Sequence, residues 1–367
     1  MLNWLVTILL LLNVLHNSVT SVFTWVEDIK YGLLIIVLLS IIFKVNWKNF
    51  NFTFRGNELL ILVFILFYIT ISSLISSINT SFYELAVSLS EFILYIFIII
   101  GTKEKVFSLR KIIFYNFLVS IVLYILWEMD FFRSIVPGLT TIGIINNNAL
   151  SFMLLSFIII SNFNVYLKSL LTVFTLFISI QLNAGGTIIV GSLYIISIAL
   201  VFLFKRMYKY LILITLNLSV IATIYLSVNE IFFIGDINID NALTNRISLW
   251  STYTIEVFSS AKNLIFGVGD TTLLDTSILG VLINNPHSMY VTLLFENGIL
   301  LLVIFMIFIN FLVIKYTAPK YVLFFLILSF YGLIYPMELG NFHAYGLYYL
   351  FSILLLTQSS KRMDLID

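Results

Sequence analysis

The chain has no cysteine, so disulfide bonds and thiolate chemistry are excluded from its fold and its function. Charge is also scarce: Asp, Glu, Lys and Arg make up 10% of the residues, whereas soluble domains carry about 25%. There are only four prolines, no visible internal repeat, and no basic patch of the kind that binds nucleic acid. These absences point away from soluble and nucleic-acid-binding proteins.

Apolar sequence takes the place of charge, and 61% of the residues are hydrophobic. Apolar runs of roughly 17–25 residues recur along the whole chain, and each is long enough to cross a bilayer as a helix. Helices are expected because lipid offers no partner for backbone N–H and C=O groups. The runs do not alternate polar and apolar residues as a transmembrane β-barrel would. The sequence therefore predicts an all-α, polytopic transmembrane bundle.

Twelve candidate spans follow from these runs. They cover residues 2–22, 30–46, 57–77, 82–101, 111–128, 147–163, 166–183, 186–204, 209–228, 287–314, 320–337 and 341–357. The first run has no basic segment before it and no clear cleavage site, so we expect a retained helix rather than a signal peptide. The tenth is too long for one straight span and contains Glu296-Asn297-Gly298. We expect a break there, with a short outer helix from Pro286 and a membrane helix from about Ile299.

Positive charge predicts the orientation, because Lys and Arg concentrate in cytoplasmic loops. An inside N-terminus places all but four of the 19 basic residues on the inner side. The inner set is Lys44, Lys48, Arg55, Lys103, Lys105, Arg110, Lys111, Lys168, Lys205, Arg206, Lys209, Lys315, Lys320, Lys361 and Arg362, and the outer set is Lys30, Arg133, Arg246 and Lys262. We therefore expect cytoplasmic termini and three parts: nine spans in residues 1–228, an extracytoplasmic loop in 229–286, and an outer helix, three spans and a short tail in 287–367.

The predicted outer loop is the only long polar interval, and Arg246 is its only arginine. Its charge is mainly acidic, so a phosphate bound there needs one well-placed cation, and the rigid fork of Arg suits that task. Residues 244–262 have the pattern of an amphipathic helix capped by Thr244 or Asn245, with Trp250 at the membrane interface. Its predicted apolar stripe is Ile247, Trp250, Thr254, Val257 and Phe258. Arg246 would then bind a substrate phosphate, a lipid headgroup or a structural carboxylate.

His287 stands at the start of the tenth span. With Asn285 as N-cap and Pro286 at the first helical position, His287 falls in the first turn, where the helix dipole disfavours a charged imidazole. A neutral imidazole can serve as a general base, and the alternative is a histidine bonded to a neighbouring backbone group. Before it, Gly267 and Gly269 allow positive φ or a close approach to a ligand, or form a turn without one.

Polar residues inside the predicted spans are few. Glu91 lies mid-span, which makes it either a functional acid or a protonated one bonded to Asn116 or Ser120. Asn217 and Asn310 lie in two other spans, and we expect them to make hydrogen bonds between helices.

The Arg-x-x-x-Trp start of the loop helix, the Gly-x-Gly turn and the Pro-His element ahead of Glu-x-Gly resemble the O-antigen ligase/polymerase superfamily, which includes the Wzy-type polysaccharide polymerases. The resemblance implies transfer of a glycan from undecaprenyl pyrophosphate to an acceptor hydroxyl at the outer face of the bacterial cytoplasmic membrane, without metal or cofactor. It implies that Arg246 holds the donor pyrophosphate and that His287 activates the hydroxyl. Further substrate contacts would come from Trp250, Gly267, Gly269 and Tyr290.

A second region is similar in a looser way. Arg133, followed by Gly138 and then Asn148 at a helix start, is similar to the outer-loop Arg and helix-opening Asn of the family. The family often has an Arg beside the turn between two middle helices, where this chain has Gly185-Gly186 and no cation. We expect either Arg133 or the backbone N–H groups of this helix start to take its place.

The leading interpretation is therefore a polymerase of lipid-linked repeat units that makes a capsular, O-antigen or exopolysaccharide. Its implied partners are the lipid-linked oligosaccharide as donor and acceptor, the bilayer, and flippase and chain-length regulator proteins. A ligase that passes finished glycan to another acceptor shares the same chemistry. A flippase or transporter also fits twelve spans, although transporter sites usually lie at the membrane midplane and the polar groups here do not.

Overall fold

The computed structural model describes residues 2–12, 25–46, 57–77, 82–128, 147–182, 184–204, 207–243, 245–269, 277–278, 281–282, 286–334 and 344–359. This part of the chain is almost entirely helical, which confirms the predicted all-α class. Its long helices are α1 (Leu2–Leu12), α3 (Trp25–Lys44), α4 (Asn57–Ser77), α5 (Phe82–Lys103), α6 (Leu109–Glu128), α8 (Asn147–Ile160), α9 (Val165–Gln181), α10 (Gly185–Phe204), α11 (Tyr208–Val228), α15 (Met289–Lys315), α16 (Pro319–Tyr331) and α17 (Ala344–Ser359). Each predicted span overlaps one of these helices.

Within the described residues, three helices, α10, α11 and α15, are long and apolar enough to cross a membrane. Large apolar side chains point outward from all three, among them Phe202, Ile214 and Ile307. An outer surface of this kind suits contact with lipid rather than water. The protein is therefore a membrane protein by its helices, while twelve spans and the predicted orientation stay predictions.

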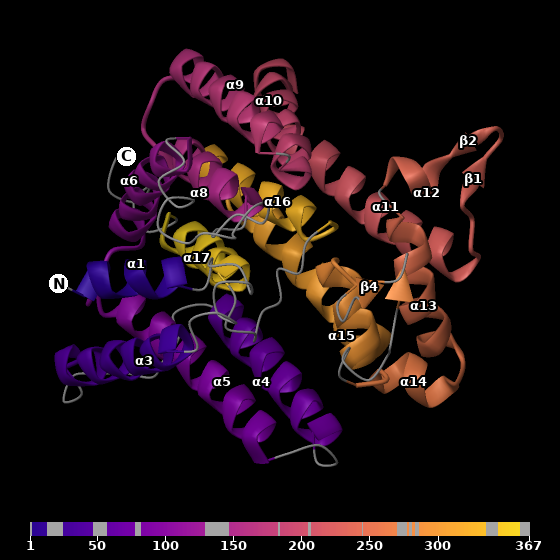
Figure 1. Ribbon diagram of the computed structural model, residues 1–367, viewed down its shortest axis with the longest axis horizontal. Coiled ribbons are helices and arrows are strands. Elements are labelled where there is room, and N and C mark those ends of the chain that lie inside the picture. Colours follow the sequence, from indigo (N-terminus) through magenta and orange to yellow (C-terminus); the bar gives the residue numbers. More distant parts are fainter. Residues whose placement is uncertain are drawn as a thin grey trace.

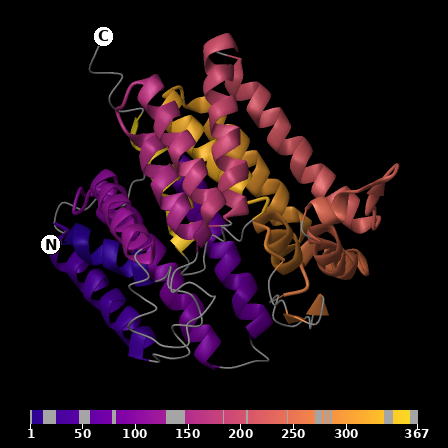
Figure 2. The same ribbon diagram turned by 45° about the horizontal axis from the view of Figure 1, so that its top comes forward.

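Helix α15 organises the bundle. It packs against α4 on one side and α11 on the other, and the shorter helices α13 (Arg246–Phe258) and α14 (Ala261–Phe266) lie along its N-terminal part (Figure 1). Helix α16 is buried along its length and contacts α8, α10, α11 and α17. Helices α8, α9 and α10 pack beside one another (Figure 2).

The predicted break in the tenth span is confirmed. Gly298 has φ 77° and ψ 178°, which is not helical, so α15 consists of a short first segment and a long second one. The second segment, from residue 299 to Lys315, extends for about 25 Å at the rise of an α-helix. Groups at its two ends are therefore well separated.

Amide side chains join helices inside the bundle, as predicted for one pair. Asn217 of α11 donates to Asn310 of α15 with a distance of 2.9 Å from Nδ2 to Oδ1, which confirms the expected interhelical bond. Asn116 of α6 donates to the hydroxyl of Tyr348 of α17 at 2.9 Å. The side chain of Glu91 lies outside the described residues.

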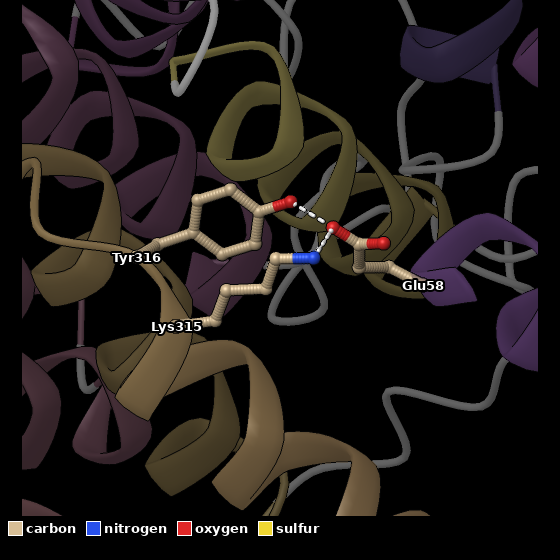
Figure 3. Close-up of polar contacts among 3 residues, drawn as sticks. All are labelled: Glu58, Lys315 and Tyr316. Carbon is tan, nitrogen blue, oxygen red and sulfur yellow. Dashed lines mark hydrogen bonds and ion pairs between the residues drawn. The ribbon is translucent and has the colours of Figure 1, made fainter. Parts of the chain in front are cut away.

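Basic residues of the predicted inner set gather at the C-terminal end of α15. The Lys315 ammonium lies 2.6 Å from Oε1 of Glu58 in α4, and the Tyr316 hydroxyl donates to the same oxygen at 2.5 Å (Figure 3). Lys209, at the start of α11, donates to the carbonyl of Ile314 at 2.9 Å. These contacts fasten α4 and α11 to one end of α15.

The segment between α11 and α15 holds short elements, as predicted for the large loop. In the described part they are the hairpin β1 (Phe233–Ile234) with β2 (Ile237–Asn238), helix α12 (Ile239–Ala242), helices α13 and α14, and the hairpin β3 (Ser277–Ile278) with β4 (Val281–Leu282). Phe233 pairs with Asn238 in the first hairpin, and Ser277 with Leu282 in the second. Within the described residues, α13 and α14 of this segment pack on α15.

Candidate active site

The start of α13 is fixed by an acid from α12. Oδ1 of Asp240 accepts from the backbone N–H groups of Ile247 at 2.7 Å and Ser248 at 3.1 Å. A carboxylate at this place satisfies helix N–H groups that have no partner within the helix, and it complements the helix dipole. Asn245, one of the two predicted caps, has the left-handed conformation and makes no capping bond with its side chain. Asn245 thus holds the N-cap position while Asp240 supplies the side-chain acceptor, and Thr244, the other predicted cap, lies outside the described residues.

This anchored helix start presents Arg246 to two other segments. Nη1 of the guanidinium donates to the carbonyl of His287 at 3.2 Å and to the carbonyl of Ile334, just after α16, at 2.7 Å. Arg246 is partly buried. One cation therefore ties α13 to the entry of α15 and to the end of α16.

Trp250, one turn further along α13, donates to the carbonyl of the residue before His287. Its Nε1 donates to the carbonyl of Pro286 at 2.8 Å, and the side chain is 3% exposed. The side chain therefore packs inside the protein, where a buried indole needs a partner for its N–H and finds it in the segment before α15. Its position at the membrane interface stays a prediction. The predicted stripe of α13 is otherwise buried, except for Phe258, which is exposed.

The segment Pro286–Ser288 is not helical, contrary to the prediction. Helix α15 begins at Met289, and Ser288 is its N-cap. His287 has φ 52°, a left-handed conformation that excludes it from a helical first turn. The Met289 N–H donates to the carbonyl of Gly332 at 2.8 Å, so the end of α16 holds this segment from the other side.

The imidazole of His287 is nevertheless kept neutral, as predicted, although the cause differs. The pKa of His287 is lowered to about 4, first because burial disfavours the charged ring and second because Arg246 is positive. At neutral pH the ring is uncharged and can accept a proton. The predicted pair of an arginine and a neutral histidine is thus brought together.

The predicted glycine turn packs on the break of α15. Gly267 has φ 84°, and a Cβ there would overlap the backbone of Glu296; a Cβ on Gly298 would overlap the backbone of Ile265. The Val268 N–H donates to the carbonyl of Phe295 at 2.6 Å. Only glycine permits such a close approach of two backbones. Gly267 therefore has a packing role, and its contact with substrate, like that of Gly269, stays a prediction.

The second predicted region also comes together. Helix α10 opens at Gly185, as expected, and Gly186 is buried in its first turn. The hydroxyl of Thr187 donates to the carbonyl of Asn148 at 3.2 Å. The structure thus joins the glycine turn to the helix-opening asparagine.

This second region lies toward the same end of α16 as Arg246. Phe152, one turn after Asn148, stacks on Tyr331, the last residue of α16, with 4.8 Å between the ring centroids. Ile334, whose carbonyl binds Arg246, follows three residues later. The described residues of the two predicted groups therefore lie toward the C-terminal end of α16.

Two further predicted residues have different outcomes. Tyr290 is fully buried, and its hydroxyl donates to the carbonyl of Ser329 at 2.9 Å, so its ring is packed inside the bundle in this structure. Arg133 lies outside the described residues. In the part of the chain that the structure describes, no three His, Asp or Glu side chains come together to hold a metal ion.

Sequence reasoning missed Asp240 and Ser288, which position the two central residues. Ser288 carried a local signal, since serine followed by an apolar helix is a common N-cap. Asp240 carried none, because it lies in a separate helix, six residues before Arg246. No protein-family model, curated protein or solved structure matches this chain.

Proposed function

We propose that the protein is a membrane glycosyltransferase that polymerises undecaprenyl-pyrophosphate-linked oligosaccharide repeat units at the outer face of the bacterial cytoplasmic membrane. The observation that carries the proposal is the pairing of Arg246 with an uncharged His287 at the entry of a spanning helix. Displacement of a lipid pyrophosphate requires a cation that binds the pyrophosphate and a base that takes the proton of the acceptor hydroxyl.

The proposed reaction is a direct displacement with inversion. An imidazole nitrogen of His287 takes the proton of the acceptor hydroxyl, and the acceptor oxygen forms a bond to the anomeric carbon of the donor glycan. The bond from that carbon to the pyrophosphate oxygen breaks, and undecaprenyl pyrophosphate leaves with the electron pair. Arg246 stabilises the charge of this leaving group, which grows during the step.

The charge distribution supports the proposed orientation. Lys209 and Lys315 lie at the C-terminal end of α15, while Arg246 and His287 lie at its N-terminal end. If the basic end faces the cytoplasm, as such ends do, the candidate site faces outward. There it would meet lipid-linked glycan already delivered across the membrane.

The test is a polymerisation assay with purified full-length protein in proteoliposomes, supplied with a lipid-linked repeat unit, with products resolved by glycan length. Replacing His287 by asparagine keeps a residue that tolerates the left-handed backbone and removes the base, so we expect a loss of at least about 100-fold. Arg246→Lys keeps the charge but loses the fork, and we expect a loss of about tenfold or more.

Lys262→Gln is the matched control, because Lys262 is the exposed cation of α14 in the same folded loop. It should leave the rate unchanged. An active His287→Asn variant would exclude the proposed base. Transfer of a finished glycan to a second acceptor without lengthening would indicate a ligase, and movement of the lipid across the vesicle without any transfer would indicate a flippase.

A further inference from the structure

Three basic side chains meet at the end of the bundle opposite to Arg246 and His287. Arg110 lies at the start of α6, Lys168 in the first turn of α9 and Lys320 at the start of α16. We call these three residues the basic triad. All three belong to the predicted inner set, and α16 separates them from the candidate active site by about 20 Å at the rise of an α-helix.

Tyr321 stands between two members of the triad. Its hydroxyl accepts a hydrogen bond from Nη2 of Arg110. The Cζ of Arg110 lies 5.4 Å from the centroid of the Tyr321 ring, and Nζ of Lys320 lies 4.9 Å from the same centroid. Both distances are within the range of a cation–π interaction. One buried ring therefore holds two positive charges next to each other.

The third cation is held against the end of α8. Nζ of Lys168 donates to the carbonyl of Ile159 at 2.7 Å, and Nζ of Lys320 donates to Oδ1 of Asn162 at 2.6 Å. The charges of Lys168 and Lys320 are close enough to act on each other. These like charges repel each other, whereas an anion placed among them would be attracted by each cation.

The surface beside the basic triad carries exposed apolar side chains. Phe163 lies between α8 and α9, and Tyr166 and Leu167 lie in the first turn of α9, next to Lys168. Their side chains are exposed, Tyr166 by 84%. Exposed aromatic residues beside Lys or Arg are typical of the boundary between acyl chains and headgroups. A ligand with both a phosphate and an apolar body fits this surface better than a free ion does.

We propose that the basic triad binds the phosphate of an anionic phospholipid headgroup. The acyl chains of that lipid would lie along Phe163 and Tyr166, and the phosphate would sit among the three cations. Basic pockets between membrane helices at a cytoplasmic surface bind anionic lipid headgroups in this way.

The test measures lipid binding to the purified, delipidated full-length protein in detergent, read as the rise in thermal unfolding temperature during titration. The probes are phosphatidylglycerol, phosphatidylcholine and inorganic phosphate. We expect stabilisation by phosphatidylglycerol at lower concentration than by phosphatidylcholine. A basic residue near a headgroup contributes about fivefold in affinity, so Arg110→Gln/Lys320→Gln should bind phosphatidylglycerol about 25-fold more weakly.

Lys209→Gln is the matched control, because Lys209 also donates to a carbonyl and lies 5.3 Å from a tyrosine ring, Tyr210, at the same end of the bundle. It should bind like the wild type. If the double variant does not fold, Lys320→Gln alone should show a fivefold loss. Equal affinity of variant and wild type overturns the proposal, and so does stabilisation by inorganic phosphate at the same concentration as phosphatidylglycerol.

Discussion

Lowering the pH should destabilise the folded protein through His287, and this effect can be isolated. The pKa of His287 is about 4 in the folded protein, against an ordinary value of 6.5. Between these values the unfolded chain binds a proton that the folded protein rejects. The stability that the neutral ring contributes is therefore fully present above pH 6.5 and is lost as the pH falls toward 4.

The magnitude follows from the two pKa values. Between pH 7 and pH 4.5, the difference in proton binding lowers the free energy of unfolding by about 2 kcal/mol. Burial is the larger cause and the charge of Arg246 the smaller, so Arg246→Gln should raise the pKa of His287 and recover a minor part of this loss.

The assay is equilibrium unfolding in mixed micelles of detergent and dodecyl sulfate at several pH values, with His287→Asn as the reference. Carboxylates titrate in both proteins, so the difference between the two curves reports His287 alone. The wild type should lose about 2 kcal/mol more than the variant over this range. If the two proteins lose the same free energy of unfolding over this pH range, the ring of His287 is not held in a desolvated, positively charged environment. That result would refute the reasoning on which the proposed base depends.

Three further perturbations test the frame around the site by the same unfolding assay. Gly298→Ala should lower the free energy of unfolding by at least about 2 kcal/mol, because a Cβ there is strained at positive φ and overlaps another backbone. Gly235→Ala is the control, since Gly235 also has positive φ but lies in open space, and it should lower the free energy of unfolding by about 1 kcal/mol. Equal losses would contradict the close backbone packing at Gly298. Asp240→Ala removes the cap of α13 and should cost about 1 kcal/mol, and a neutral result would mean that another group caps the helix. In a double-mutant cycle, Asn217→Leu and Asn310→Leu should show a coupling of about 0.6 kcal/mol, and strict additivity would argue against their hydrogen bond.

Features that depend on local sequence were predictable. The break at Gly298 follows from three residues, Glu-Asn-Gly, that interrupt an apolar run, and no tertiary contact is needed to see it. The bond between Asn217 and Asn310 was also predictable, since an amide in an apolar helix must find a polar partner. The helical class follows from composition, because lipid permits few alternatives for the backbone.

Features that depend on distant contacts were not predictable. Trp250 has the pattern of an interfacial residue, but its N–H is satisfied by Pro286, 36 residues later in the chain. His287 was expected in a helical turn, yet the carbonyl of Gly332 and the cap at Ser288 start the helix after it. The neutral state of the ring was predicted through the helix dipole, whereas burial and Arg246 are its causes.

The two α13 side chains that hold the entry of α15 bind main-chain oxygens. Arg246 donates to the carbonyls of His287 and Ile334, and Trp250 donates to that of Pro286. Every amino acid supplies a carbonyl oxygen, so substitutions at residues 286 and 334 can leave these bonds intact. The two donors, Arg246 and Trp250, are harder to replace, because few other side chains carry an N–H group at the same distance from the backbone. Divergent versions of this protein should accordingly keep the arginine and the tryptophan, while residues 286 and 334 vary.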